Sequence, residues 1–176
     1  QRELDVVGTV RIAGALELLQ SSNNTFVGTS TGNISTTTGS SNVAVGVDSL
    51  NNNTGGNGNV AVGKGALSAN TGNNNTGTGS LALENISTGA QNTGIGRQAL
   101  QNATTGLCNV GIGHIAGSLV DGGAANTAPD VSIFIGGSTK SKNNNDTNQI
   151  VIGHNAIGEG SNTARIGNTS VNQLHV

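Results

Sequence analysis

Hydrophobic and polar positions alternate in a five-residue motif that occurs nine times along the chain. Its clearest copy is NVAVG at residues 42–46, which places a small residue between two β-branched ones and closes on glycine. The copies begin at Asn24, Asn42, Asn59, Asn75, Asn92, Asn109, Ser132, Gln149 and Thr163. Most copies therefore follow one another at a nearly constant step, with one long step after Asn109 and a short last one. A repeat this short and regular predicts an all-β fold, a parallel β-solenoid or β-roll of about nine short rungs.

Each copy of this repeat motif predicts a strand with two different faces. Side chains two residues apart share a face, so Val43 and Val45 and their counterparts form one apolar wall along the rod. The residue between them is Ala or Gly in most copies, which suits a face with little room behind it. The closing glycine indicates positive φ or a close backbone approach. The small-then-apolar pair that follows, as at Ala66 and Leu67, predicts a short second strand before an Asn/Thr/Gly turn.

The repeat divides the chain into three parts. In residues 1–22, apolar and glycine residues alternate with polar ones between Leu4 and Leu18, which predicts a half-buried pair of strands leading into the rod. Residues 23–167 hold the repeats. Residues 168–176 leave the period and are expected to form a terminal strand or tail.

The longest step between motifs, from Asn109 to Ser132, carries an insertion. About six residues more than in the usual step must leave the rung, and we expect a loop at about residues 117–131. Insertions in solenoids form surface loops, often on a functional face. The candidate receptor-binding residues in it are Leu119, Asp121, Asn126 and Asp130. The alternative is a tolerated loop without a role in binding.

Composition narrows the classes of function. Only 33% of residues are hydrophobic, 1% aromatic and 9% charged, so order must come from repetition and not from a large globular core. The net charge is −2 and the seven basic residues form no patch, which argues against nucleic-acid binding. No apolar run approaches the ~20 residues that span a bilayer, so no membrane insertion is expected. The single cysteine, Cys108, is expected to be a small buried residue.

One copy of the chain leaves apolar surface uncovered. A coil of so few residues encloses little volume, and the first and last rungs are open edges that invite association. Three rods packed along a common axis bury a second apolar wall, and closed cyclic symmetry is the usual arrangement of identical surfaces. We therefore expect a homotrimer, although the repeat by itself also allows a monomer or a dimer.

Residues suited to catalysis or metal binding are few. Asp48 and Glu84 lie near corresponding turns but two rungs apart, so they do not form a glycosidase pair, and no enzyme activity is expected. His114 and His154 both follow a closing glycine. In a trimer each can form a ring of three imidazoles that binds a transition metal, but other copies carry varied polar residues there, which favours a surface position. We expect no cofactor.

Three segments resemble fibrous surface proteins. The motif at residues 42–46, with pairs such as Ala66-Leu67, resembles the head repeats of trimeric autotransporter adhesins, although those trimeric left-handed β-rolls have a shorter repeat. Residues 148–171 resemble the segment that precedes the self-cleaving trimerisation chaperone of viral and phage tail fibres. Residues 4–14 are also similar to fibre strand repeats.

These resemblances imply a trimeric, non-enzymatic segment of a virus or phage tail fibre. It is then part of the virion and binds a cell-surface glycan of the host, with many weak polar contacts strengthened by multivalency. The alternatives are a bacterial surface adhesin, a polysaccharide depolymerase and a fibre spacer. An ice-binding array is disfavoured, because Thr76 and Thr78 are flanked by copies with Val and Ile.

Overall fold

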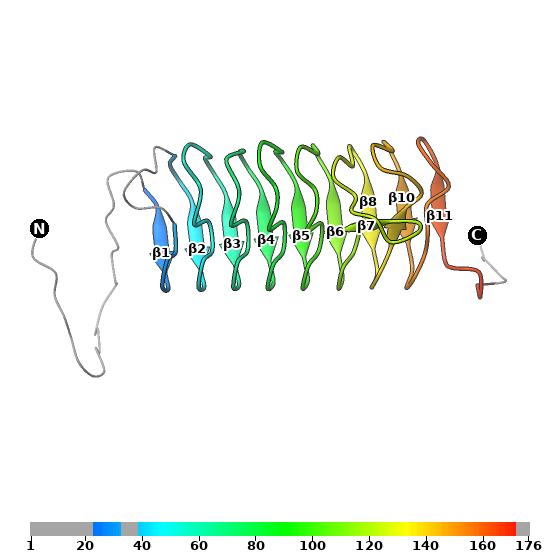
Figure 1. Cartoon of the computed structure of the whole chain (residues 1–176), viewed down its shortest axis with the longest axis horizontal. Coiled ribbons are helices and arrows are strands. Elements are labelled where there is room, and N and C mark those ends of the chain that lie inside the picture. The colour runs from blue at the N-terminus through cyan, green and yellow to red at the C-terminus, as the bar shows by residue number, and fades with distance from the viewer. Residues whose placement is uncertain (1–22, 33–38, 172–176) are drawn as a thin grey trace, which may run out of the picture.

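The chain forms a rod of stacked coils, with the strands lying across its long axis (Figure 1). A computed structural model describes residues 23–32 and 39–171. Nine strands form one sheet in chain order, each parallel to the next. They are β1 (Thr25–Val27), β2 (Val43–Val45), β3 (Val60–Val62), β4 (Thr76–Thr78), β5 (Thr93–Ile95), β6 (Val110–Ile112), β8 (Ile133–Ile135), β10 (Ile150–Ile152) and β11 (Ala164–Ile166). The predicted all-β parallel solenoid is confirmed, and the described residues contain no helix.

The repeat motifs stack in register despite their unequal spacing. Val43 pairs with Val60 across a step of ordinary length. Val110 pairs with Ile133 across the longest step, and Ile150 with Ala164 across the shortest. Differences in the number of residues between two motifs therefore do not change the register of the strands. Extra residues leave the rung at its turns, where the hydrogen bonds of the sheet are not interrupted.

From β2 to β6, the core is made by the small central residue of each strand and by a leucine from a turn. Leu67 packs over Gly77 and Leu100 over Gly111, so closely that a Cβ on these glycines would lie 3.1 and 2.6 Å from the leucine Cγ. Phe134 takes the same central position in β8 and is fully buried. The small central residues thus make room for leucines of the neighbouring coils, in a rod too thin for two large side chains.

The predicted second strand of each rung is wrong for the regular coils. After the closing glycine the chain forms turns, and the leucines that enter the core have positive φ, 49° at Leu50 and 53° at Leu67. The coils still hydrogen-bond to one another here: the Leu50 N–H donates to the Ala66 carbonyl at 3.0 Å. In the coils that carry Leu50, Leu67, Leu83 and Leu100, the leucine therefore marks an inward-pointing corner and not a strand.

A ladder of buried asparagines runs along the inside of the rod. The Oδ1 atom of Asn42 accepts the backbone N–H of Asn59 at 2.8 Å, and the Nδ2 atom of Asn42 donates to the Gly56 carbonyl at 2.9 Å. The same two kinds of bond recur in the following coils up to Asn109. Each asparagine thus satisfies a backbone donor and a backbone acceptor that burial would otherwise leave unpaired. Sequence reasoning assigned asparagine only to exposed turns and missed this role.

The closing glycine of the motif has both a positive φ and a close backbone approach, the two properties that its position predicts. Gly63 has φ +133°, and a Cβ on it would lie 2.6 Å from the carbonyl carbon and oxygen of Gly79 in the next coil. No L side chain fits that approach without a shift of backbone.

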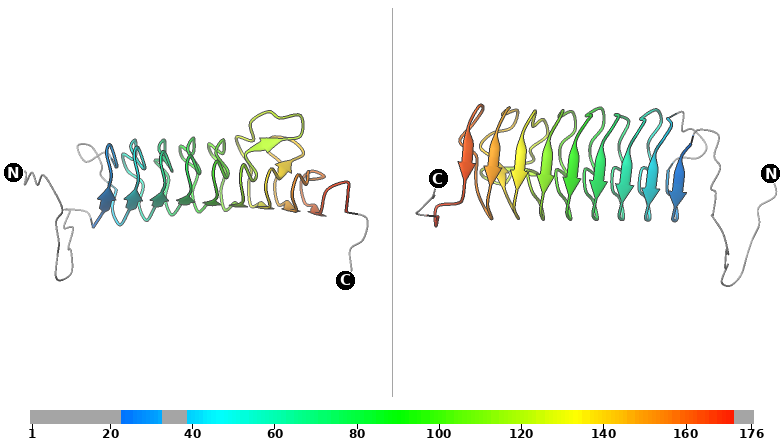
Figure 2. Two further views of the ribbon diagram at one scale, coloured as in Figure 1. Left: turned by 90° about the horizontal axis from the view of Figure 1, so that it is seen from below. Right: turned by 180° about the vertical axis from the view of Figure 1, so that it is seen from behind.

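The insertion forms a small lobe on the side of the rod opposite the nine-stranded sheet (Figure 2). Strand β7 (Leu119–Val120) of the insertion pairs in parallel with β9 (Lys140–Ser141) of the next coil. We call residues 119–126 and 140–146 the side lobe. The predicted lead-in strands of residues 1–22 and residues 172–176 of the predicted tail lie outside the described residues.

Candidate functional site

The outer face of the nine-stranded sheet carries uncharged and mostly β-branched side chains. The first and third residues of each strand point outward, and all of these positions hold Val, Ile, Thr or Ala. Exposed members are Val27, Val43, Val45, Val62, Ile95, Ile112, Ile135, Ile150 and Ile166, with exposed fractions of 36–50%. We call this surface the outer apolar face. An exposed surface that carries this many apolar side chains is typical of an interaction site.

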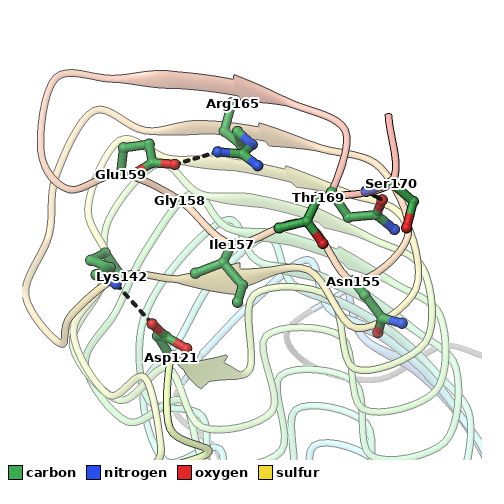
Figure 3. A pocket seen from close by; sticks show the side chains of 10 residues that line it. Asp121, Lys142, Asn155, Ile157, Gly158, Glu159, Arg165, Thr169 and Ser170 are labelled. Atoms are coloured by element: carbon green, nitrogen blue, oxygen red, sulfur yellow. Dashed lines mark hydrogen bonds and ion pairs between the residues drawn. The ribbon is translucent and has the colours of Figure 1, made fainter. Parts of the chain in front are cut away.

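A second feature is a hollow of about 420 Å³ between the side lobe and the last two rungs (Figure 3). Its lining residues are Asp121, Lys142, Asn155, Ile157, Gly158, Glu159, Arg165, Asn168, Thr169 and Ser170. The side lobe supplies the first two, the coil after β10 supplies the next four, and β11 with the turn after it supplies the rest. Residues from four successive coils of the chain therefore meet at one place.

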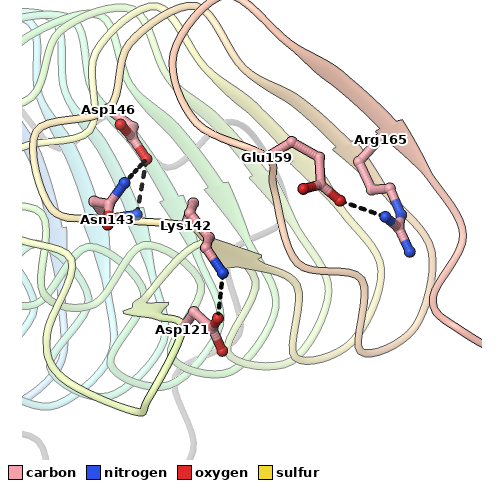
Figure 4. Close-up of polar contacts among 6 residues, drawn as sticks. All are labelled: Asp121, Lys142, Asn143, Asp146, Glu159 and Arg165. Carbon is pink, nitrogen blue, oxygen red and sulfur yellow. Dashed lines mark hydrogen bonds and ion pairs between the residues drawn. The ribbon is translucent and has the colours of Figure 1, made fainter.

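One ion pair joins the two strands of the side lobe. Lys142 Nζ lies 2.8 Å from Asp121 Oδ2, and both side chains are partly exposed, at 46% and 38% (Figure 4). The hydrogen bond and charge of Lys142 lower the pKa of Asp121 below its ordinary value, and the same contact raises the pKa of Lys142. Both groups are therefore charged at neutral pH.

A second ion pair, between Arg165 and Glu159, stands on the other side of the hollow (Figure 4). Arg165 pairs in register with Val151, so it occupies the central strand position that holds a core residue in the preceding rungs. Its Nε donates to the Gly167 carbonyl at 2.9 Å. A cation thus replaces an apolar side chain on the last strand of the sheet, which covers the end of the apolar core with a polar group.

The rest of the lining combines neutral polar groups with one apolar side chain. Asn168 is held by two bonds, since its Nδ2 donates to the His154 carbonyl at 2.8 Å and its Oδ1 accepts the Ser170 N–H at 2.9 Å. Ile157 is half-buried and provides the apolar contribution. Gly158 is buried, and a Cβ on it would lie 2.1 Å from Gln149 Oε1, so the lining at this point must be backbone.

The structure places one of the four candidate receptor-binding residues in the hollow. Asp121 lines it, whereas Leu119 is half-buried in β7. Asn126 is fully buried, and its Nδ2 donates to the Gly117 carbonyl at 3.1 Å. Asp130 Oδ1 accepts the N–H of Leu107 at 2.9 Å and so ties two coils together. The contact of Asn126 with Gly117 thus serves the packing of the side lobe against the rod.

Sequence reasoning missed the other charged residues of the hollow, Lys142, Glu159 and Arg165. A signal was present, since seven of the sixteen charged residues fall between Asp121 and Arg165. The separation in sequence is 21 within the first pair and 6 within the second, and neither matches a repeat of the motif. The partners could therefore not be inferred from the rung period.

His114 and His154 lie on the surface of different rungs. His114 Nε2 is 2.8 Å from Arg97 Nη1, and His154 Nε2 is 3.0 Å from Asn155 Nδ2. In the described part of the chain, no three His, Cys, Asp or Glu side chains are grouped as metal ligands.

The prediction that Cys108 is buried is wrong. The cysteine is exposed, because it occupies the corner before the motif, where φ is 55° and the side chain points away from the core. Its Sγ donates to Gln91 Oε1 at 3.4 Å, and Gln91 holds the same corner of the preceding coil.

Within residues 23–32 and 39–171, no helix has the length and hydropathy needed to cross a bilayer. No protein-family model matches the sequence. No curated protein and no solved structure is similar enough to count as a match.

Proposed function

We propose that this chain is a non-enzymatic segment of a host-attachment fibre of a virus or phage, built as a homotrimer and displayed on the virion. The outer apolar face is the observation that carries this proposal. It extends along all nine rungs, a length on the order of 40 Å at the interstrand spacing of ~4.8 Å. In the nine described strands of this sheet, the outward positions hold no charged side chain.

Other copies of the same chain are the occupants that best fit this face. A second copy presents the same rows of β-branched side chains at the same spacing, so ridges and grooves can match along the whole rod. Of residues 23–32 and 39–171, the charged ones, which oppose burial of a face, are confined to the turns and the side lobe, apart from Arg165 at the inward position of β11. Three copies are favoured over two by the resemblance of the repeat motif and of residues 148–171 to trimeric adhesins and fibres.

In such a trimer the side lobes point outward. The side lobe lies opposite the nine-stranded sheet (Figure 2), so burying the sheet face leaves the lobe and the hollow accessible. Three identical sites on one rigid rod bind a multivalent cell surface more tightly than one site does. A cell-surface glycan, which repeats the same units many times, is therefore the receptor class that we propose.

The chemistry of the hollow supports binding over hydrolysis. A glycosidase needs a carboxylic acid whose pKa is raised so that it can donate a proton. The pKa of Asp121 is instead lowered by Lys142, and Glu159 is paired with Arg165. The Asp121 carboxylate therefore accepts hydrogen bonds and does not donate a proton at neutral pH.

A glycan array combined with a product assay tests the proposal. The full chain is applied to immobilised bacterial and animal glycans, and the best-bound glycan is then incubated with the protein in solution. The expected result is binding without release of new reducing ends. Release of reducing ends would show a depolymerase, and absence of binding to cells and glycans alike would favour a fibre spacer.

A further inference from the structure

We propose that the hollow lined by Asp121, Lys142, Glu159 and Arg165 is a binding site for a neutral sugar ring. This proposal rests on the attachment function proposed above and assigns a place and a ligand class to it. The site is built from separate parts of the chain, namely the side lobe, the coil after β10, and β11 with its following turn. A volume of about 420 Å³ lies within the range of ~300–1,000 Å³ typical of small-ligand sites.

The charged side chains of the hollow have hydrogen-bonding capacity left after pairing. Lys142 Nζ has three N–H donors and uses one on Asp121, and each carboxylate has a second oxygen. The ion pairs therefore present a donor beside an acceptor, held at a set distance by the contact between them. A sugar hydroxyl is both donor and acceptor, so two neighbouring hydroxyls on a ring match such a pair.

The balance of charge favours a neutral sugar over an acidic one. Two cations and two carboxylates line the hollow, so their formal charges cancel. An acidic sugar would meet two carboxylates, and both cations are already engaged with them. A neutral ring exchanges its water contacts for hydrogen bonds without this repulsion.

The remaining lining accounts for how a ring would lie and how tightly it would bind. Ile157 offers an apolar contact to the C–H face of a ring, and the hydroxyls of Thr169 and Ser170 stand at another side of the hollow (Figure 3). The lining includes no aromatic ring to stack on a sugar. Binding at a single site is therefore weak, and firm attachment depends on several copies acting together.

Saturation-transfer NMR on the full chain tests this site. The probes are the methyl glycosides of glucose, galactose, mannose and N-acetylglucosamine, with methyl glucuronide as the acidic comparison. The site variants are Lys142→Met and Glu159→Gln. The matched controls are Lys64→Met and Glu84→Gln, whose parent residues lie on other rungs and do not line the hollow.

The expected result is saturation transfer from the protein to at least one neutral methyl glycoside and none to the methyl glucuronide. Each site variant should weaken that binding by about tenfold or more, as loss of a hydrogen bond to a charged group does, and the controls should leave it unchanged. Circular dichroism and particle mass equal to wild type confirm that a variant is folded.

Three results would overturn the site. Equal binding by wild type and both site variants would place the sugar elsewhere and leave the attachment function standing. Preference for the glucuronide would refute the neutral class. Failure of every glycoside to bind would refute the site, and a positive glycan array would then still support attachment through another surface.

Discussion

Asp121 and Lys142 form an ion pair, with 2.8 Å between Oδ2 and Nζ, because they continue the parallel register of β7 and β9. Leu119 pairs with Lys140 and Val120 with Ser141, and the Asp121 N–H then donates to the Ser141 carbonyl at 2.8 Å. The side chains that follow on the two strands therefore lie side by side. This ion pair joins the segment after β7 to the segment after β9 and forms one wall of the hollow.

The pKa of Asp121 tests whether this contact exists in solution. Lys142 holds it below the ordinary value of 3.8, so the pair persists as the pH falls to 3.8 and is lost only when the pH passes through the lower folded-state pKa. At the other limit, the raised pKa of Lys142 keeps the pair charged until the pH exceeds 10.5. In Lys142→Met the pKa of Asp121 should rise toward its ordinary value. An NMR titration of the side-chain carboxyl carbon measures it, and an unchanged pKa in the variant would contradict the contact.

The asparagine ladder predicts a large loss of stability on truncation at a central rung. Asn92→Ala removes the acceptor of the Asn109 N–H and the donor to the Gly106 carbonyl, both inside the rod. The expected cost is about 3 kcal/mol, from buried groups left without a partner. The exposed Asn85→Ala, one turn earlier, should change stability by less than about 0.5 kcal/mol. Urea unfolding at one protein concentration compares them, and equal midpoints would refute the ladder as a source of stability.

The closing glycine of the motif predicts a difference between two glycine substitutions. Gly122 has φ +88° and open space around it, so Gly122→Ala should cost only backbone strain, about 1 kcal/mol. Gly63→Ala adds a clash with Gly79 of the next coil, at 2.6 Å, and should cost about 3 kcal/mol or more. Thermal unfolding of the two variants measures the difference. Similar melting temperatures would show that the coils are farther apart than described.

If the outer apolar face is the interface of the homotrimer, one charged side chain placed on it should dissociate the trimer. Ile95 lies in β5, near the middle of the rod, and its side chain is 42% exposed in a single copy. Ile95→Lys places a charge inside the proposed interface and should reduce the particle to monomers, whereas Asn85→Lys on an exposed turn should not. Light scattering on both variants checks this. An Ile95→Lys protein with the wild-type mass would exclude the face as the interface.

The strands and their two faces could be predicted from the sequence, because the same alternation of side chains recurs in every copy of the motif. Val43 and Val45 share a face in any strand, so their separation from Ala44 follows from the alternation of side chains. The turns are less predictable, since the same residue types serve opposite roles there. Leu50 enters the core through a left-handed corner, and Cys108 leaves the core through another. Asparagine likewise serves both the exposed turns and the buried ladder, as Asn57 and Asn59 do.

The hollow was less predictable because it arises from departures from the repeat. The long step located Asp121 in an insertion, but its partner Lys142 comes from the following coil and pairs with it only through β7 and β9. Arg165 fills a motif position that is apolar elsewhere, and only the stacking of β11 on β10 shows that it faces the hollow. Contacts of this kind depend on where irregular segments fold back, which periodicity does not encode.

The mass of the wild-type particle in solution tests the trimer most directly. One chain has a mass of 17.3 kDa, and a homotrimer has three times that mass. Light scattering on the eluting peak of a size-exclusion column measures the mass without assumptions about shape, which matters for a rod. The account predicts a single species with the mass of three chains that persists on dilution, and a folded species with the mass of one chain would contradict it.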